Sequence, residues 1–173
     1  MNKERIPAVA TTPILLSLGS NLGDRAANLR AALAGLGRFM HVTAVSPLYD
    51  TAPMYVTDQP AFLNVAVTAE TALRPHDLLR ALKALEARLG RVSGRRYGPR
   101  VIDLDIVMYG GEAITSDELT IPHARMTERA FVLIPASDIA GDWVHPLDGR
   151  SIRALSEALG PSDDLVRRED LAA

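Results

Sequence analysis

Residues 98–107 read GPRVIDLDIV, a run of valine, isoleucine and leucine that two aspartates interrupt. In a β-strand, successive side chains point to opposite faces of the sheet. One face then carries the apolar side chains Ile102, Leu104, Ile106 and Met108, and the other carries Val101, Asp103, Asp105 and Val107. The stretch therefore predicts a strand with one face in the core and two carboxylates on the opposite face.

The strand predicted over residues 62–71 follows the same alternation. Leu63, Val65 and Val67 point inward, which leaves Phe62, Asn64, Ala66 and Thr68 on the other side. An aromatic ring and an amide are thus expected on the face that carries the two carboxylates.

The rest of the chain supplies the other elements of a small sheet protein. The sequence predicts a strand at 13–20, a helix that Asp24 caps and Gly37 ends, a strand at 41–50, a proline-rich loop at 51–60, a strand at 62–71 and a helix at 74–90. With 98–107 as the fourth strand, the order is βαββαβ. This order is typical of the α+β, ferredoxin-like fold, an antiparallel sheet with its helices on one face.

The chain beyond Tyr109 is expected to form C-terminal additions to that fold. These are a hairpin around residues 109–114, a long loop to Arg129, a short segment at 130–140 and a helix over 152–159. With 173 residues, the chain suits a single domain over 12–173. Residues 1–11 are expected to be a flexible leader.

Composition narrows the class of protein. The net charge of −2 argues against a nucleic-acid-binding surface, and the absence of cysteine removes disulfides, thiolate zinc sites and thiol nucleophiles. No apolar run reaches the roughly 18 residues of a membrane span. We therefore expect a cytoplasmic protein that binds neither nucleic acid nor membrane. We also expect a monomer, although composition does not bear on the oligomeric state.

Asp103 and Asp105 have two interpretations. Half-exposed strands often carry aspartate for solubility alone. Alternatively, carboxylates at i and i+2 stand roughly 6.6 Å apart along a strand, a span that can flank a pair of divalent ions about 3.5–4 Å apart. Because the available ligands are oxygens, such a site would select magnesium.

Arginines crowd the segment before this strand, at positions 88, 91, 95, 96 and 100. The planar guanidinium of arginine matches phosphate oxygens, so the segment is a candidate anion site. A solvated loop whose arginines pair with helix acids such as Glu86 is the alternative. Together, cations and metal-binding carboxylates favour magnesium and a polyphosphate. The phosphate-binding motif GxxxxGK[ST] and a Ser-His-Asp set are both missing.

Several stretches, in order, resemble one family. They are SLGSNLGDR, SPLYDTAPM, DQPAFLNVAV, LEARLGRV, YGPRVIDLDI, LTIPH and RAFVLIP, spread from Ser17 to Pro135. On these motifs the chain resembles the 6-hydroxymethyl-7,8-dihydropterin pyrophosphokinases of folate biosynthesis. The resemblance implies a ferredoxin-like fold and transfer of pyrophosphate from ATP to 6-hydroxymethyl-7,8-dihydropterin, which gives AMP and the pterin diphosphate.

The resemblance also implies roles for individual residues. Asp103 and Asp105 would hold two Mg²⁺ ions, and together with Arg91 and Arg100 would be the catalytic residues. The residues implied for ATP are Arg91, Arg100, Ile106, Thr120, His123 and Arg129. Those implied for the pterin are Thr51, Ala52, Pro53, Met54, Phe62, Asn64, Tyr97 and Phe131. Phe62 and Phe131 would sandwich the ring, and Asn64 would bind its amide edge.

Some positions depart from the pattern of the family. Family members usually have tryptophan at Tyr97, an aromatic residue at Ala124 and a basic residue at Glu118, and the loop around Ser93 and Gly94 is usually longer. These departures motivate an alternative, a non-catalytic ferredoxin-like module that binds a nucleotide or pterin. A metal-dependent phosphohydrolase is a third interpretation. The glycines and arginines of residues 93–98 suggest a loop that closes over substrate.

Overall fold

The structure, a computed structural model, describes residues 9–53, 57–94 and 98–168. Its larger sheet is built from β1 (Thr12–Ser20), β2 (His41–Val45), β3 (Tyr49–Thr51), β4 (Phe62–Thr71), β5 (Asp103–Tyr109) and β8 (Leu165–Arg167). The helices are α1 (Arg25–Leu36), α2 (Pro75–Arg88), a 3₁₀ turn η1 (Met126–Glu128), α3 (Ala130–Ala140) and α4 (Ile152–Leu159). A separate two-stranded sheet pairs β6 (Ile114–Thr115) with β7 (Thr120–Ile121).

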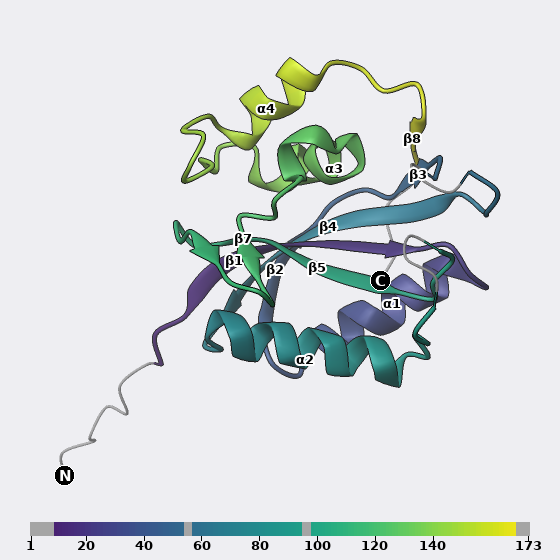
Figure 1. The fold of residues 1–173 in the computed structure, drawn as a ribbon, viewed down its shortest axis with the longest axis horizontal. Helices are drawn as coiled ribbons and strands as arrows, with labels where there is room; N and C mark the ends of the chain where they lie inside the picture. Colours follow the sequence, from purple (N-terminus) through teal and green to yellow (C-terminus); the bar gives the residue numbers. More distant parts are fainter. Residues whose placement is uncertain (1–8, 54–56, 95–97, 169–173) are drawn as a thin grey trace, which may run out of the picture.

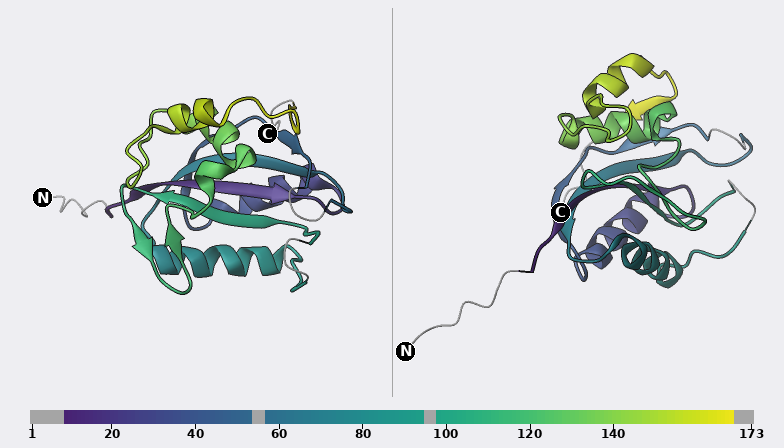
Figure 2. Two further views of the ribbon diagram at one scale, coloured as in Figure 1. Left: turned by 45° about the horizontal axis from the view of Figure 1, so that its top comes forward. Right: turned by 60° about the vertical axis from the view of Figure 1, so that its left-hand side comes forward.

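The sheet has the predicted antiparallel topology. Its strand order is β5-β1-β4-β3-β8, and β2 also pairs with β4. Helices α1 and α2 lie on one face, and α3 and α4 lie over the other (Figure 1). The right-hand view of Figure 2 shows these three layers edge-on. The ferredoxin-like α+β prediction is confirmed, and α3 and α4 are its C-terminal additions.

Two apolar clusters lie on either side of the sheet. The larger one joins the inward side chains of β1, β4 and β5, among them Leu18, Val65 and Leu104, to α1 and α2. The second packs Leu15 and Ala66 against α3 and α4. Helices α3 and α4 therefore cover part of the face that carries the carboxylates. The part of this face beyond the start of α3 is left uncovered, and a site can form there.

Local sequence explains the elements that were predicted well. Asp24 caps α1, since its carboxylate accepts a hydrogen bond of 3.0 Å from the Ala27 amide. Pro75 occupies the first turn of α2, and Gly90 follows that helix with φ +96°, a conformation that suits glycine. The strand predicted over 62–71 is β4 with the same bounds.

The fourth strand begins later than predicted, at Asp103 rather than at Gly98. A β-bulge also changes its alternation, because Leu15 lies opposite Met108 and Leu16 lies opposite Ile106. The extra residue, Val107, turns Met108 to the α3 side, so the prediction that Met108 lies in the main core is wrong.

Three further boundaries differ from the prediction. The strand predicted over 41–50 is split into β2 and β3 at Ser46 and Pro47, since proline cannot donate to a ladder. The hairpin expected around 109–114 instead joins β6 to β7. Strand β8 was not foreseen. Within the described residues, no helix is long and apolar enough to cross a membrane.

Candidate active site

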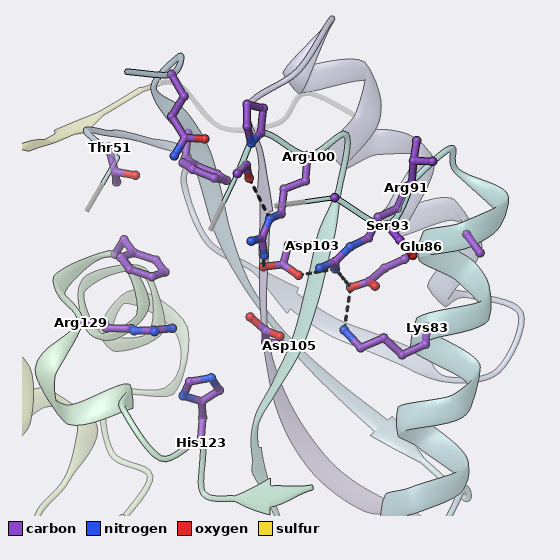
Figure 3. A pocket seen from close by; sticks show the side chains of 18 of the residues that line it. Thr51, Lys83, Glu86, Arg91, Ser93, Arg100, Asp103, Asp105, His123 and Arg129 are labelled. Carbon is purple, nitrogen blue, oxygen red and sulfur yellow. Dashed lines mark hydrogen bonds and ion pairs between the residues drawn. The ribbon is translucent and has the colours of Figure 1, made fainter. Parts of the chain in front are cut away.

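A cavity of about 750 Å³ opens between the end of the sheet, the C-terminal end of α2 and the start of α3. Predicted site residues that line it are Thr51, Ala52, Phe62, Arg91, Arg100, Asp103, Asp105, His123, Arg129 and Phe131. In Figure 3, His123 and Arg129 approach from one side and Lys83, Glu86 and Arg91 from the other, with Asp105 between them. Residues far apart in the sequence thus meet around one space.

Strand pairing sets the floor of this cavity. Asp103 lies opposite Gly19, which in turn lies opposite Asn64 on β4. Because directly opposed residues share a face, the carboxylate and the amide flank a strand position that has no side chain. A Cβ atom at Gly19 would stand 2.7 Å from Asn64 Oδ1 and 3.6 Å from Phe62 Cδ1. A side chain at this position would therefore displace the Asn64 amide.

Asp103 is held by two arginines. Arg91 Nη1 donates to Asp103 Oδ1 at 2.5 Å, and Arg100 Nη1 donates to Oδ2 at 2.8 Å. Burial disfavours the charged carboxylate, but the positive charges of Arg100 and Arg91 outweigh it and hold the pKa of Asp103 below its usual value. Asp103 is thus a charged carboxylate at neutral pH. Its partners, Arg91 and Arg100, are the cations that were predicted to bind phosphate.

Asp105 lies in a different environment. Burial, followed by the negative charge of Asp103, raises the pKa of Asp105 to about 7. Because the two carboxyl groups are two residues apart on one strand, a negative charge on one disfavours a negative charge on the other. A cation in this cavity would therefore interact favourably with both groups.

Glu86, a buried residue of α2, joins that helix to the site. Its Oε1 accepts hydrogen bonds from Lys83 Nζ at 3.0 Å and from the Leu104 amide at 2.7 Å, and it lies 2.7 Å from Arg91 Nη1. Leu104 is the residue between the two aspartates. Glu86 therefore fixes both an arginine of the site and the strand that presents the carboxylates.

The opposite wall carries His123, Arg129 and Phe131. The His123 Nδ1 atom accepts a hydrogen bond of 3.2 Å from the Arg125 amide, which places the proton of the neutral ring on Nε2. Burial and the charge of Arg129 lower the pKa of His123. The Arg129 guanidinium lies over the Phe131 ring, with Cζ 5.6 Å from its centroid. This wall offers a neutral donor, a cation and an aromatic surface.

Asn64 lies just beneath the cavity wall rather than in it. It is buried, and its Nδ2 donates to Thr51 Oγ1 at 2.6 Å. Because Thr51 ends β3 and lines the cavity, this bond holds the start of the 51–60 loop against β4. Asn64 thus supports the aromatic end of the cavity through Thr51.

The remaining predicted residues lie elsewhere. Ile106 is in the core on the α1 and α2 side, so only its backbone can reach a ligand. Thr120 is exposed on β7, and Pro53 lines a neighbouring cavity of about 550 Å³. Met54 and Tyr97 lie outside the described residues, as does part of the predicted closing loop at 93–98.

Lys83 and Gln59 also line the cavity and were not predicted from the sequence, whereas Glu86 was predicted only as a possible partner of the arginines, a pair that Arg91 forms. A signal for Glu86 was present, since it lies four residues after Leu82 and therefore on the buried face of α2. An acidic residue on such a face needs hydrogen-bonding partners. Nothing comparable in the sequence marks Gln59.

The carboxylates suit a magnesium site that substrate completes. In the part of the chain that the structure describes, no three His, Cys, Asp or Glu side chains form a group that could hold a metal. Magnesium is commonly bound by one or two carboxylates, with phosphate oxygens and water completing its shell. Asp103 and Asp105 beside a cluster of arginines fit that pattern.

Comparison with known proteins gives consistent matches. Residues 15–141 match the family model described as 7,8-dihydro-6-hydroxymethylpterin-pyrophosphokinase. A Methylorubrum extorquens protein named 2-amino-4-hydroxy-6-hydroxymethyldihydropteridine pyrophosphokinase is 45% identical over 153 residues, which cover 87% of this chain and 96% of that protein. A Pisum sativum protein named folate synthesis bifunctional protein, mitochondrial, is 46% identical over 169 residues, 91% of this chain.

The chain spans only 33% of the length of the Pisum sativum protein and 24% of that of an Arabidopsis thaliana relative. Among solved structures, a variant of Plasmodium falciparum HPPK-DHPS bound to SDX-DHP superposes with a TM-score of 0.75 at 15% identity. That match covers 94% of this chain and 50% of the other. At this identity it shows the fold alone.

Proposed function

The chain belongs to the 7,8-dihydro-6-hydroxymethylpterin-pyrophosphokinase family, and we propose that it transfers pyrophosphate from ATP to 6-hydroxymethyl-7,8-dihydropterin in the synthesis of tetrahydrofolate. The observation that carries this proposal is that one cavity is lined by two chemically different sets of side chains. One set is aromatic and neutral polar, with Phe62, Phe131 and Thr51, and the other consists of arginines and two carboxylates. A flat heterocycle and a polyphosphate need those two environments.

Phe62 and Phe131 are the proposed surfaces for the pterin ring, with Thr51 and Ala52 at its polar edge and Asn64, buried behind Thr51, as the proposed partner of its amide edge. Stacking of a ring on aromatic side chains contributes about 1–3 kcal/mol per base in nucleic-acid complexes, and a pterin has a comparable π-face. We retain Pro53, Met54 and Tyr97 as proposed pterin contacts. Together, the proposed pterin contacts would fix the position of the hydroxymethyl group that accepts the pyrophosphate.

Arg91, Arg100, Arg129 and the Nε2 of His123 are the proposed contacts of the phosphates. Ile106 would contribute its backbone, because β5 is an edge strand and the Leu104 amide already points outward to Glu86. In a regular strand the N–H and C=O of the residue two positions on lie on that same edge. Thr120 remains a proposed contact of the nucleoside.

Asp103 and Asp105 are the proposed holders of magnesium, with two ions as the resemblance to the family implies. When bound with the triphosphate, magnesium supplies neutralisation of phosphate charge and lowers the pKa of a coordinated hydroxyl. Arg91 and Arg100, which pair with Asp103 in this structure, then turn to the phosphate oxygens. Phosphoryl-type transfer depends on alignment and charge neutralisation, so no dedicated base is needed.

The reaction forms a bond from the hydroxymethyl oxygen of the pterin to the β-phosphorus of ATP and breaks the bond from that phosphorus to the oxygen shared with the α-phosphate. AMP leaves with that oxygen, and the alcohol proton is released to solvent. The arginines hold the transferred group in line between the two oxygens. We also propose that the protein is a cytoplasmic monomer without nucleic-acid or membrane partners. The Pisum sativum relative, in contrast, is named mitochondrial.

Mass spectrometry tests the activity. The protein is incubated with Mg²⁺, ATP and 6-hydroxymethyl-7,8-dihydropterin, and AMP and the pterin diphosphate should form in equal amounts. Binding of both compounds without AMP would instead support the non-catalytic module. Release of phosphate or pyrophosphate in the absence of the pterin would support a phosphohydrolase.

A further inference from the structure

Asn21, in the turn between β1 and α1, joins two segments that are far apart in the sequence. The side chain is buried. Its Nδ2 donates to Gln59 Oε1 at 3.0 Å and to the Pro60 carbonyl at 3.1 Å. Its Oδ1 accepts from the Arg100 amide at 2.8 Å, and its own amide donates to the Arg100 carbonyl at 3.1 Å.

The two segments carry or lead to the contacts proposed for the two different substrates. Gln59 and Pro60 close the loop that begins at Thr51, on the aromatic side. Arg100 belongs to the segment that leads into β5, where its guanidinium binds Asp103. One amide side chain therefore contacts the pterin side through Nδ2 and the phosphate side through Oδ1.

Burial makes these contacts interdependent. A buried amide that loses a hydrogen-bonding partner is left unsatisfied without access to water, so the bonds to both segments are strongly favoured together. If a ligand fixes the Arg100 segment, Asn21 is fixed with it, and so is the end of the 51–60 loop. Coupling between two sites is reciprocal, which makes the effect equal in both directions.

Accepting the pyrophosphokinase function proposed above, we propose that Asn21 is a positioning residue that couples nucleotide binding to pterin binding. It contacts neither substrate. It makes the affinity for the pterin depend on an occupied phosphate site, so that the acceptor alcohol is fixed when the triphosphate is already aligned. Neither the predicted site residues nor the comparisons assign Asn21 a function.

A matched control lies in the first turns of α1 and contacts the same turn between β1 and α1. Asn28 Nδ2 donates to Ser20 Oγ at 3.1 Å and to the Leu22 carbonyl at 2.8 Å. Asn28 thus holds the turn from the α1 side, without a hydrogen bond to either the 59–60 or the 98–100 segment. Asn28→Ala removes an amide of the same kind and leaves the connection between the two segments intact.

The test is the thermodynamic coupling measured by isothermal titration calorimetry. The Kd of 6-hydroxymethyl-7,8-dihydropterin is measured with and without Mg²⁺ and an α,β-methylene analogue of ATP, and the Kd of the analogue with and without the pterin. For wild type and Asn28→Ala we expect each ligand to tighten the other by a factor in the range of about 5- to 150-fold. For Asn21→Ala the factor should fall to within about twofold of unity.

Asn21→Asp gives a second measurement if Asn21→Ala folds poorly. The aspartate keeps an oxygen for the Arg100 amide and loses the N–H that donates to the Pro60 carbonyl, so the coupling factor should again fall. A thermal melt confirms that each variant is folded.

Wild-type coupling in either Asn21 variant would overturn the inference, as would a wild type whose two ligands bind independently. Loss of coupling in Asn28→Ala as well would show that any loosening of the turn has this effect, which would also overturn it. If wild type binds neither compound, the proposed function itself fails, and this inference fails with it.

Discussion

Glu86 accepts a hydrogen bond of 2.7 Å from the backbone amide of Leu104, the residue between Asp103 and Asp105. A buried carboxylate of α2 thereby sets the position of the strand that presents the two proposed metal ligands. The same oxygen lies 2.7 Å from the Arg91 guanidinium. The stability of the fold and the geometry of the site thus share one group.

Replacing Glu86 with leucine should strongly destabilise the protein. The change leaves the buried Leu104 amide without its acceptor, which costs about 1–3 kcal/mol, and it removes one of the two carboxylates that Arg91 pairs with, since Asp103 remains. Urea denaturation at pH 7 measures the loss. Glu86→Gln is the matched control, since it keeps an oxygen for the Leu104 amide and should lose less. Equal losses in the two variants would mean that the hydrogen bond to Leu104 contributes little.

Asp105 should make the metal-free protein less stable as the pH rises. Its folded pKa of about 7 lies above the unfolded value of 3.8, so the unfolded state gives up this proton first. The stability contribution is complete below pH 3.8 and is lost as the pH rises through 7. Asp105→Asn avoids that loss. Its melting temperature in EDTA should exceed that of wild type by more at pH 8 than at pH 5, and an equal difference at both values would refute the raised pKa.

Gly19→Ala should weaken pterin binding while leaving nucleotide affinity nearly unchanged. The added Cβ would meet Asn64 Oδ1 at 2.7 Å, a contact that forces the amide or the strand to move. We expect at least a tenfold rise in the Kd of the pterin, about 1.4 kcal/mol. Gly111→Ala is the control, because a Cβ there has nothing within 4 Å. A nucleotide affinity that falls equally would place Gly19 at the wrong end of the cavity.

The ion pair between Asp50 and Arg168 should fasten β8 to the sheet. Asp50 also pairs with Arg25, at 2.7 Å, and burial of Asp50 is outweighed by hydrogen bonds from Arg168 and Arg25, which lower its pKa. A lowered pKa adds stability above the unfolded value of 3.8, and that stability is lost as the pH falls through the folded value.

Asp50→Asn should therefore destabilise the protein at pH 7 and have much less effect at pH 3. Arg168→Ala removes only one partner and should cost about 0.2–1 kcal/mol at pH 7. Denaturant titrations at the two pH values measure both changes. An effect of Asp50→Asn that does not depend on pH would rule out a contribution from its charge.

Much of the sheet could be predicted from the sequence because β4 and the first part of β5 alternate between apolar and polar faces. Strand β4 combines period-two alternation with turn residues on both sides, and its bounds are as expected. The fourth strand was predicted to start at Gly98, although Gly98–Val101 follow the apolar pattern only loosely. In the structure the Arg100 amide donates a hydrogen bond to Asn21 Oδ1 instead of to a neighbouring strand, and β5 begins at Asp103. A hydrogen bond to a residue 79 positions away has no local signal.

The C-terminal third was harder to predict for a different reason. Helix α3 is apolar along its length and contains Pro135, so neither helical nor strand periodicity stands out. Strand β8 is three residues long and forms only because β3 offers an edge. The bulge at Val107, which reverses the expected face of Met108, likewise follows from pairing with β1 rather than from the residues of β5.

The site residues also differ in whether they could be predicted from the sequence. Two carboxylates on one strand and arginines before it could be found by periodicity and composition. Lys83 and Asn21 could not be assigned to the site, because their importance comes from the residues they meet in three dimensions. Ile106 shows the reverse case, since periodicity already placed its side chain in the core, where only its backbone can serve a ligand.

The most direct test of the account is the dependence of AMP formation on magnesium in wild type and in Asp105→Ala. With ATP and 6-hydroxymethyl-7,8-dihydropterin, wild type should form AMP and pterin diphosphate at a rate that rises with magnesium and then saturates. Asp105→Ala should remain folded and form neither product at any magnesium concentration. Wild-type turnover in chelator, or full activity of Asp105→Ala at ordinary magnesium, would contradict the account.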